Sequence, residues 1–223
     1  MEKYLKVLKK CPLFEGIEDE NLLKMLHCLG ARVLTFEKHQ IIFGEGASAK
    51  YIGIVLSGAV QVFQVDYYGN RSIFSNLCAS EIFAEAYACS ALENLPVSIE
   101  ASEAACVMLI EAAHVLYTCH SNCGFHQRLI YNLMRDLAEK TLLFHERIDI
   151  TSRRTTREKL LAYLTAYSRR EGRESFEIPF DRQELADYLE VERSGLSSEI
   201  GKLRREGVLE SHRKYFRLIS LNR

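Results

Sequence analysis

The hydrophobic positions near the C-terminus predict two short helices separated by a tight turn, within residues 180–207. Two apolar stripes with helical spacing carry this prediction: Leu185, Ala186 and Leu189 on the first helix, and Leu196, Ile200 and Leu203 on the second. Val191 lies between them, where an apolar residue would plug the turn. The second helix has an opposite, polar face made of Ser194, Ser198 and Arg205, with Ser197 at its edge and Arg193 at its entrance. Such a helix suits contact with a polar, anionic partner.

The N-terminal half changes from a helical period to a period of two. Residues 1–30 predict short helices, with the apolar stripe Leu22, Leu23, Leu26 and Leu29. From residue 32 to residue 110, apolar and polar positions alternate in short runs separated by turn signals such as Ser57-Gly58. Short strands at this spacing predict a compact antiparallel barrel or jelly roll.

A long helix is predicted to follow this strand region, beginning at Phe125. Its apolar positions step by three or four: Ile130, Leu133, Leu137, Phe144 and Ile148. Such a helix either covers its own barrel or meets a partner. Residues 149–156 are polar and predict a hinge, followed by a helix that Ser152 or Thr155 could cap, with Glu158 completing a capping box. Residues 176–180 predict a short strand, and residues 208–221 predict a two-stranded wing.

Composition limits the class of protein. The chain has 223 residues, of which 48% are hydrophobic, enough for two domains. It lacks an apolar run of eighteen residues, and its charged amphipathic start does not resemble a signal peptide, so we expect a cytoplasmic protein that does not enter membranes. Its seven cysteines are then expected to be free thiols. Residues 1–148 hold 13 Lys+Arg against 17 Asp+Glu, whereas residues 149–223 hold 16 against 13, which favours nucleic acid as the partner of the C-terminal half.

Two motifs resemble a known family. Residues 36–63, FEKHQIIFGEGASAKYIGIVLSGAVQVF, resemble the β-roll of cyclic-nucleotide-binding domains, and residues 180–207 resemble a DNA-binding helix-turn-helix. Together, in this order, they resemble the CRP/FNR family of bacterial transcription regulators. The resemblance implies an α+β fold with an antiparallel β-roll sensor domain (residues 1–110), a dimerisation helix and hinge (residues 111–149) and a winged helix-turn-helix domain (residues 150–223). It also implies a homodimer on a palindromic double-stranded operator, with RNA polymerase as a possible further partner.

The expected effector pocket departs from the cyclic-AMP-binding members. Those members carry a Gly-Glu pair and an Arg-Ser pair that grips the phosphate, but this sequence has Ala84-Glu85 and Leu95-Pro96. It also has Ala138-Glu139 where a Thr-Ser pair would reach the adenine, and no lysine or arginine between residues 71 and 128. A buried phosphate needs a positive partner, so we expect a small effector other than cyclic AMP. The expected lining is Phe83, Glu85, Tyr87 and Cys89, with Tyr131 and Asn132 from the long helix. Alternatively, these are ordinary core residues of a roll that binds nothing.

The expected DNA contacts follow from side-chain chemistry. Arg193 can bind guanine O6 and N7 through its fork and is the first candidate for sequence readout. Ser194 and Ser198 replace a glutamate and an arginine of the resembled family, and with Ser197 they can donate hydrogen bonds to bases or phosphates. The expected phosphate contacts are Arg182, Arg205, Arg213 and Lys214. Alternatively, Arg204 and Arg205 form only a solvated face.

Thiols and imidazoles offer a rival mechanism. Cys11 and Cys28 are too few and too far apart for the iron–sulfur site of oxygen-sensing relatives. A helical set of Cys119, His120, Cys123 and His126 could bind a metal, and His39 or His126 could bind haem. We nevertheless expect neither metal nor cofactor, and no catalytic residues, because no nucleophile–base pair or phosphate-cradling loop is visible. Two functional classes remain: a regulator controlled by a small effector, and an effector-independent or redox-responsive DNA-binding protein.

Overall fold

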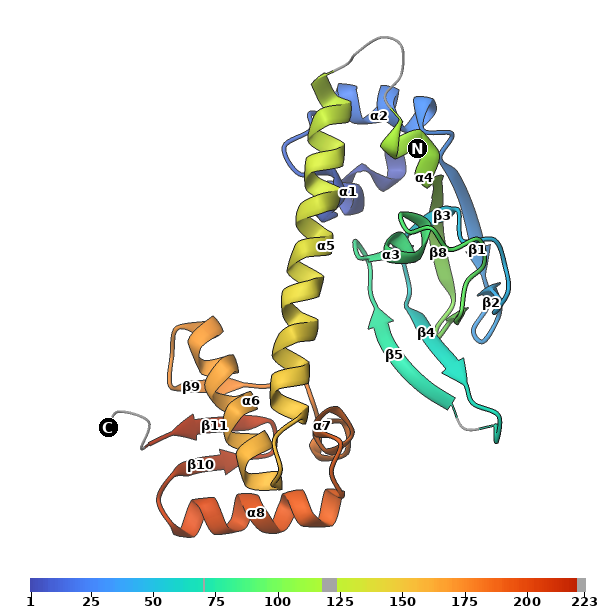
Figure 1. The fold of residues 1–223 in the computed structure, drawn as a ribbon. Coiled ribbons are helices and arrows are strands. Elements are labelled where there is room, and N and C mark those ends of the chain that lie inside the picture. Colours follow the sequence, from blue (N-terminus) through green and yellow to red (C-terminus); the bar gives the residue numbers. More distant parts are fainter. Residues whose placement is uncertain (70, 118–123, 220–223) are drawn as a thin grey trace. The chain divides into compact units, whose positions relative to one another are not determined.

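The computed structural model describes residues 1–69, 71–117 and 124–219, and it divides the chain into two compact units. The first unit is Met1–Glu139 and the second is Lys140–Arg223. Figure 1 shows the elements of each unit along the chain. Among the described residues, no helix is long and apolar enough to cross a membrane.

The first unit begins with four short helices, as the sequence predicts. They are η1 (Glu2–Tyr4), α1 (Leu5–Leu8), η2 (Pro12–Phe14) and α2 (Asp19–Cys28). Leu22 and Leu26 of the predicted stripe are fully buried, together with Leu29 after the helix, whereas Leu23 is only partly buried. The helices therefore pack through one apolar face, which is typical of an amphipathic helix on a domain surface.

Antiparallel strands form the body of the first unit, which confirms the predicted roll. The strands are β1 (Arg32–Phe36), β2 (Ile41–Phe43), β3 (Tyr51–Ser57), β4 (Val60–Val65), β5 (Arg71–Leu77), β6 (Ile82–Phe83), β7 (Ser98–Ala101) and β8 (Ala105–Glu111). Within the described residues, they make two four-stranded sheets with the orders β1-β8-β3-β6 and β2-β7-β4-β5. Each sheet interleaves strands from distant parts of the sequence, as in a jelly roll.

Both faces of the β3–β8 sheet are buried, because β3 and β8 send alternate side chains to two different cores. Ile52, Ile54 and Leu56 of β3 join the cluster of the N-terminal helices, which also contains Leu129 and Leu133. Val55 of β3 instead joins the cluster between the two sheets, with residues of β4 and β7. Alternate side chains of β3 therefore enter two different cores, and the strand is covered on both sides.

Three helices follow within or after the roll: α3 (Glu85–Ala88), α4 (Ala112–Leu116) and α5 (Gly124–Thr151). The long helix predicted from Phe125 is confirmed. Its N-terminal part is held by Asn132, whose side-chain amide donates to the carbonyls of Leu13 and Glu15 at 3.0 and 2.8 Å. Arg135 adds an ion pair with Glu15.

One expectation for α5 needs correction. The resemblance to the family implies that the apolar stripe of α5, including Leu133, pairs with a second helix, but only 1% of Leu133 is exposed and it lies in the core of its own unit. Leu137 packs partly against the same core. The exposed apolar residues of α5 are instead Phe125, Tyr131, Met134, Leu142, Leu143, Phe144 and Ile148. The predicted stripe therefore mixes residues that face the protein's own core with residues that face solvent.

The second unit contains three further helices and a small sheet. They are α6 (Thr156–Glu171), β9 (Ser175–Glu177), α7 (Arg182–Leu189), α8 (Arg193–Arg205), β10 (Leu209–His212) and β11 (Tyr215–Leu218). Within the described residues the sheet order is β10-β11-β9. The predicted capping box at the start of α6 is present, since the Thr155 hydroxyl accepts from the Glu158 amide and the Glu158 carboxylate accepts from the Thr155 amide.

Candidate functional site

One buried core holds the two helices α7 and α8, and a side-chain cap starts α7. Asp181 caps α7 by accepting from the backbone N–H groups of Gln183 and Glu184, at 2.8 and 2.9 Å. The hydrogen bond from the Glu184 N–H has the largest effect, and with that from Gln183 it holds the pKa of Asp181 below its ordinary value. The helix ends at Glu190, whose φ of 53° is in the left-handed region and turns the chain toward α8. The result is a helix-turn-helix, followed by the wing of β10 and β11.

The α8 helix has a buried face and a polar face, as its spacing predicts. The predicted core residues of both helices are buried: Leu185, Ala186, Leu189, Leu196, Ile200 and Leu203. The four predicted base-contacting residues are exposed near the start of α8: Arg193, Ser194, Ser197 and Ser198. The polar face at the start of α8 is thus exposed, and the major groove of DNA is wide enough to admit such a helix.

Basic side chains gather where the starts of α7 and α8 meet the wing. The Arg182 guanidinium lies 5.5 Å from the centre of the Phe216 ring and donates to the Arg213 carbonyl at 3.4 Å. Lys214 Nζ donates to the Pro179 carbonyl at 2.7 Å. Burial, together with the nearby positive charge of Arg193, lowers the pKa of Arg182 from its ordinary value. Glu184 lies 3.9 Å from Lys214 Nζ and compensates part of this charge. An anion that binds here would stabilise the remaining cations.

Arg205, the remaining predicted phosphate contact, does not share this cluster. It is the last residue of α8 and is exposed, about 18 Å along the helix axis from Arg193. Its guanidinium Nη1 would lie 3.7 Å from a Cβ placed on Gly201. Arg205 therefore belongs to the far end of the recognition helix.

The predicted effector residues come from β6 and α3 of the roll. Phe83 is buried, and its ring covers Gly53 so closely that a Cβ on that glycine would meet Phe83 Cζ at 2.0 Å. Glu85 is only 5% exposed. Glu85 begins α3, Tyr87 lies within it, and the Cys89 amide donates to the Glu85 carbonyl at 2.9 Å, so the three residues share one helical turn. Burial first, and then the charge of Glu85, raises the pKa values of Tyr87 and Cys89. A protonated thiol and phenol beside a buried carboxylate can donate hydrogen bonds to it or to a ligand.

The structure shows the conformation and the burial of two residues that depart from the sequence pattern of the cyclic-AMP-binding members. Ala84 adopts φ of 62°, a left-handed conformation that favours the glycine found in those members. Leu95, which replaces the arginine of their Arg-Ser pair, is buried at 3% exposure. Arg71 is engaged elsewhere, because its Nη2 lies 2.6 Å from Glu100 and its guanidinium carbon lies 3.5 Å from the centre of the Phe63 ring. Neither Leu95 nor Arg71 therefore supplies a free cation for a phosphate beside Glu85.

The two residues expected from α5 make other contacts. Asn132 is 1% exposed and uses its side-chain amide on Leu13 and Glu15, whereas Tyr131 is 57% exposed. The geometry brings together Glu85, Tyr87 and Cys89, and it gives Asn132 a role in holding the N-terminal helices. Local sequence spacing does not indicate this role of Asn132, because Asn132 and Leu13 are 119 residues apart.

The predicted metal set lies largely outside the described residues, which exclude Cys119, His120 and Cys123. His126 is described, and its Nε2 lies 2.9 Å from the His114 carbonyl, as in a hydrogen bond. His39 Nδ1 lies 3.7 Å from Glu100. Within the described ranges, no group of three or more His, Cys, Asp or Glu side chains is arranged to hold a metal ion.

A jelly-roll domain, a long helix and a winged helix-turn-helix together define the architecture of a DNA-binding transcription regulator. Residues 33–122 match the cyclic nucleotide-binding domain, and residues 158–223 match the Crp-like helix-turn-helix domain. The chain belongs to the CRP/FNR family of transcription regulators.

Solved structures share this fold at low sequence identity. The CLP regulator of Xanthomonas campestris, a c-di-GMP-responsive protein, is 15% identical with a TM-score of 0.61, over 91% of this chain and 100% of that chain. FixK2 from Bradyrhizobium japonicum is 20% identical with a TM-score of 0.54, over 84% and 92% of the two chains. DNR from Pseudomonas aeruginosa is 18% identical with a TM-score of 0.52, over 99% and 96%. Among curated protein sequences, none matches this chain.

Proposed function

We propose that this regulator is a homodimer that reads a palindromic operator through α8 and responds to a small effector other than cyclic AMP. The observation that carries the DNA-binding part is the cationic cluster at the start of α8. There Arg182 and Arg193 lie close enough to repel each other, and Arg213 and Lys214 follow on the wing. Phosphates of a duplex would neutralise this cluster while Arg193 reaches a base edge.

Binding-site selection with the wild type and two variants tests these roles. Arg193→Ala is expected to relax the preference at one base position by about 1 to 3 kcal/mol, because a bidentate base contact is lost. Arg182→Ala is expected to weaken binding to all sequences alike and to reduce the salt dependence, because a phosphate contact carries no sequence information. Equal selectivity of Arg193→Ala and the wild type would reject the assignment of Arg193.

The effector part rests on what the pocket offers. Glu85, Tyr87 and Cys89 supply a buried carboxylate with two groups that remain protonated near neutral pH. A cyclic phosphate would bring a second negative charge next to Glu85, and Leu95 cannot compensate for it. A small ligand with hydrogen-bonding groups and little negative charge fits this chemistry better.

Thermal-shift measurements with a panel of metabolites test the effector, with cyclic AMP as the comparison. We expect a ligand of low negative charge to stabilise the wild type and to lose its effect in Glu85→Gln. Stabilisation by submicromolar cyclic AMP would contradict the proposal. An operator footprint that is the same with and without every ligand would favour the effector-independent alternative.

The dimer part rests on the exposed apolar residues of α5. Tyr131, Met134 and Ile148 are 57, 65 and 62% exposed, and they recur with the three- and four-residue steps of a helix pair. We propose that these residues, with Leu142 and Phe144, contact a second copy. In sedimentation experiments Met134→Glu is expected to give monomers, whereas Glu139→Gln, on another face of the helix, is expected to remain dimeric. A monomeric wild type would contradict this part.

A further inference from the structure

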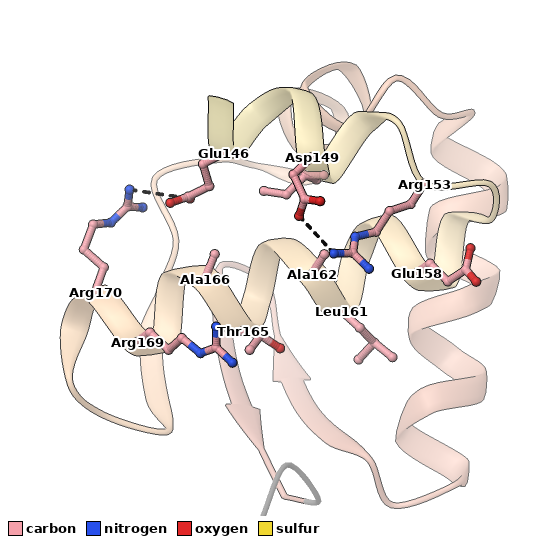
Figure 2. Close-up of a pocket in the computed structure, with 11 residues that line it drawn as sticks. Glu146, Asp149, Arg153, Glu158, Leu161, Ala162, Thr165, Ala166, Arg169 and Arg170 are labelled. Atoms are coloured by element: carbon pink, nitrogen blue, oxygen red, sulfur yellow. Dashed lines mark hydrogen bonds and ion pairs between the residues drawn. The ribbon is translucent and has the colours of Figure 1, made fainter. Parts of the chain in front are cut away.

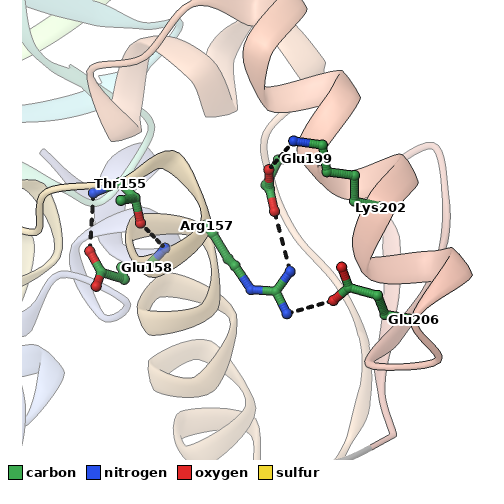
Figure 3. Close-up of polar contacts among 6 residues, drawn as sticks. All are labelled: Thr155, Arg157, Glu158, Glu199, Lys202 and Glu206. Atoms are coloured by element: carbon green, nitrogen blue, oxygen red, sulfur yellow. Dashed lines mark hydrogen bonds and ion pairs between the residues drawn. The ribbon is translucent and has the colours of Figure 1, made fainter.

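A single arginine of α6 holds two carboxylates of the recognition helix (Figure 3). Arg157 Nη2 lies 2.6 Å from Glu206, just after the end of α8, and Arg157 Nη1 lies 3.4 Å from Glu199 within α8. Lys202 Nζ lies 3.2 Å from the other oxygen of Glu199. The Arg157 guanidinium holds the pKa of Glu206 below its ordinary value. Arg157, Glu199 and Glu206 form a charged bridge between α6 and α8.

The positions of the two carboxylates decide what this bridge can do. Glu199 and Glu206 are seven residues apart, so they share one face of the helix and are separated by about 10 Å along its axis. That face borders the buried residues Leu196 and Leu203 and lies away from the exposed Ser194. The planar guanidinium of Arg157 contacts both carboxylates along this face. The two contacts together restrain both the rotation of α8 and its sliding against α6.

The apolar core alone restrains α8 less strictly. Leu196, Ile200 and Leu203 give α8 a buried face, but apolar contacts are not directional and tolerate small rotations. A rotation would move Arg193 and the serines relative to a groove by the same angle. Hydrogen-bonded ion pairs require a particular geometry, so they fix the orientation of α8 in a way that apolar burial alone does not.

We propose that Arg157 is a positioning residue for DNA recognition, which sets the rotation of α8 and thereby the sequence selectivity of the protein. This inference rests on the proposed function, in which α8 reads the operator. Arg157 itself need not touch DNA. It acts by holding Glu199 and Glu206, and it also keeps these two negative charges paired on a helix that approaches phosphates.

The test compares the full-length wild type with Arg157→Ala, Arg157→Lys and the control Arg173→Ala. Arg173 is a matched control because it also pairs with a carboxylate, Glu171 at 2.8 Å, but does so in the turn after α6. Amide hydrogen exchange reports on α8 without DNA, and competition between the selected duplex and an unrelated duplex reports selectivity.

We expect faster exchange in the α8 amides of Arg157→Ala and a loss of selectivity of about two- to fivefold, the range expected when a partly exposed ion pair is lost. Arg157→Lys keeps the charge but cannot span both carboxylates with one planar fork, so it is expected to recover general DNA affinity and only part of the selectivity. Arg173→Ala is expected to match the wild type in both measurements. Unchanged exchange and selectivity in Arg157→Ala would overturn the proposal.

A third variant separates positioning from simple repulsion. In Arg157→Ala, the carboxylates of Glu199 and Glu206 are expected to repel phosphates and to weaken binding to both duplexes. Adding Glu199→Gln and Glu206→Gln removes these charges, so affinity for the unrelated duplex is expected to recover while selectivity stays low. Full recovery of selectivity would show that Arg157 only masks charge and would overturn the positioning role. A wild type that selects no sequence would contradict the proposed function, while faster α8 exchange in Arg157→Ala would still support the bridge.

Discussion

Tyr163 of α6 carries a buried hydroxyl without a hydrogen-bond partner among the described residues. Its side chain is 3% exposed and lies among aromatic rings, with centroid distances of 5.9 Å to Tyr167, 6.1 Å to Phe180 and 5.3 Å to Tyr188. Burial raises the pKa of this hydroxyl far above its ordinary value, so it stays neutral. It contributes volume to the core of the second unit but loses its hydrogen bonds to water on folding.

The substitution Tyr163→Phe removes only the hydroxyl and leaves the ring and its neighbours. Burying an unsatisfied polar group costs about 1 to 3 kcal/mol, and the oxygen also fills space that phenylalanine leaves empty. We expect the gain to exceed the loss and Tyr163→Phe to stabilise the second unit by about 1 kcal/mol. For a unit of this size that corresponds to a rise of roughly 4 to 8 °C in its melting temperature.

Tyr167→Phe is the matched control, because it makes the same change in the same aromatic cluster. The Tyr167 hydroxyl donates to the Glu177 carbonyl at 3.0 Å, so its loss is expected to destabilise the unit by about 0.5 to 1.5 kcal/mol. Native-state hydrogen exchange of α6 and α7 amides in the full chain measures both changes. If Tyr163→Phe destabilises as much as Tyr167→Phe, the Tyr163 hydroxyl has a satisfied hydrogen bond and the reasoning is refuted.

Two further predictions concern the roll. Gly53→Ala is expected to destabilise the first unit by about 1 to 3 kcal/mol and to disturb the proposed effector site, because the new Cβ would lie 2.0 Å from Phe83 Cζ and overpack the core. Denaturant titration measures the stability, and ligand-induced thermal shifts measure the effector site. An unchanged denaturation midpoint would contradict the prediction. Arg71→Gln removes the main cause that holds the pKa of Glu100 below its ordinary value of 4.5. The wild-type pair stabilises above that value and is lost as pH falls through the lowered pKa, so the stability gap between wild type and Arg71→Gln is expected to be widest near pH 7 and to shrink below about pH 4. A gap that is constant with pH would contradict this.

The local part of the fold could be predicted because its signals are close in sequence. The stripes Leu185-Ala186-Leu189 and Leu196-Ile200-Leu203 each lie within one helix, and the capping box of Thr155 and Glu158 spans three residues. The strands of the roll were likewise visible as alternating runs. Their two-sided burial was not, because it depends on the N-terminal helices covering the outer face of β3.

The long helix shows where periodicity fails. Leu129 and Leu133 form one apolar stripe and Tyr131 and Met134 form another, shifted by one or two residues, so α5 is apolar over more than one face. Spacing alone predicts that such a helix is buried, but it does not tell which face meets the roll. The answer came from Asn132, whose bonds to Leu13 and Glu15 fix the rotation of the helix.

Those residues of the candidate DNA site that lie within a single helix could be predicted from the sequence. Arg193 and the serines follow from their position at the start of α8, and Arg182 from its place at the start of α7. Arg157 could not be found in this way, because its partners Glu199 and Glu206 lie 42 and 49 residues away and the three have no shared motif. Glu199 follows Leu196 by three residues and precedes Ile200, so it lies at the edge of the apolar stripe of α8. A charge at such an edge is costly unless an opposite charge meets it, so an acidic residue bordering the core of a recognition helix itself predicts a basic partner on the helix packed beside it.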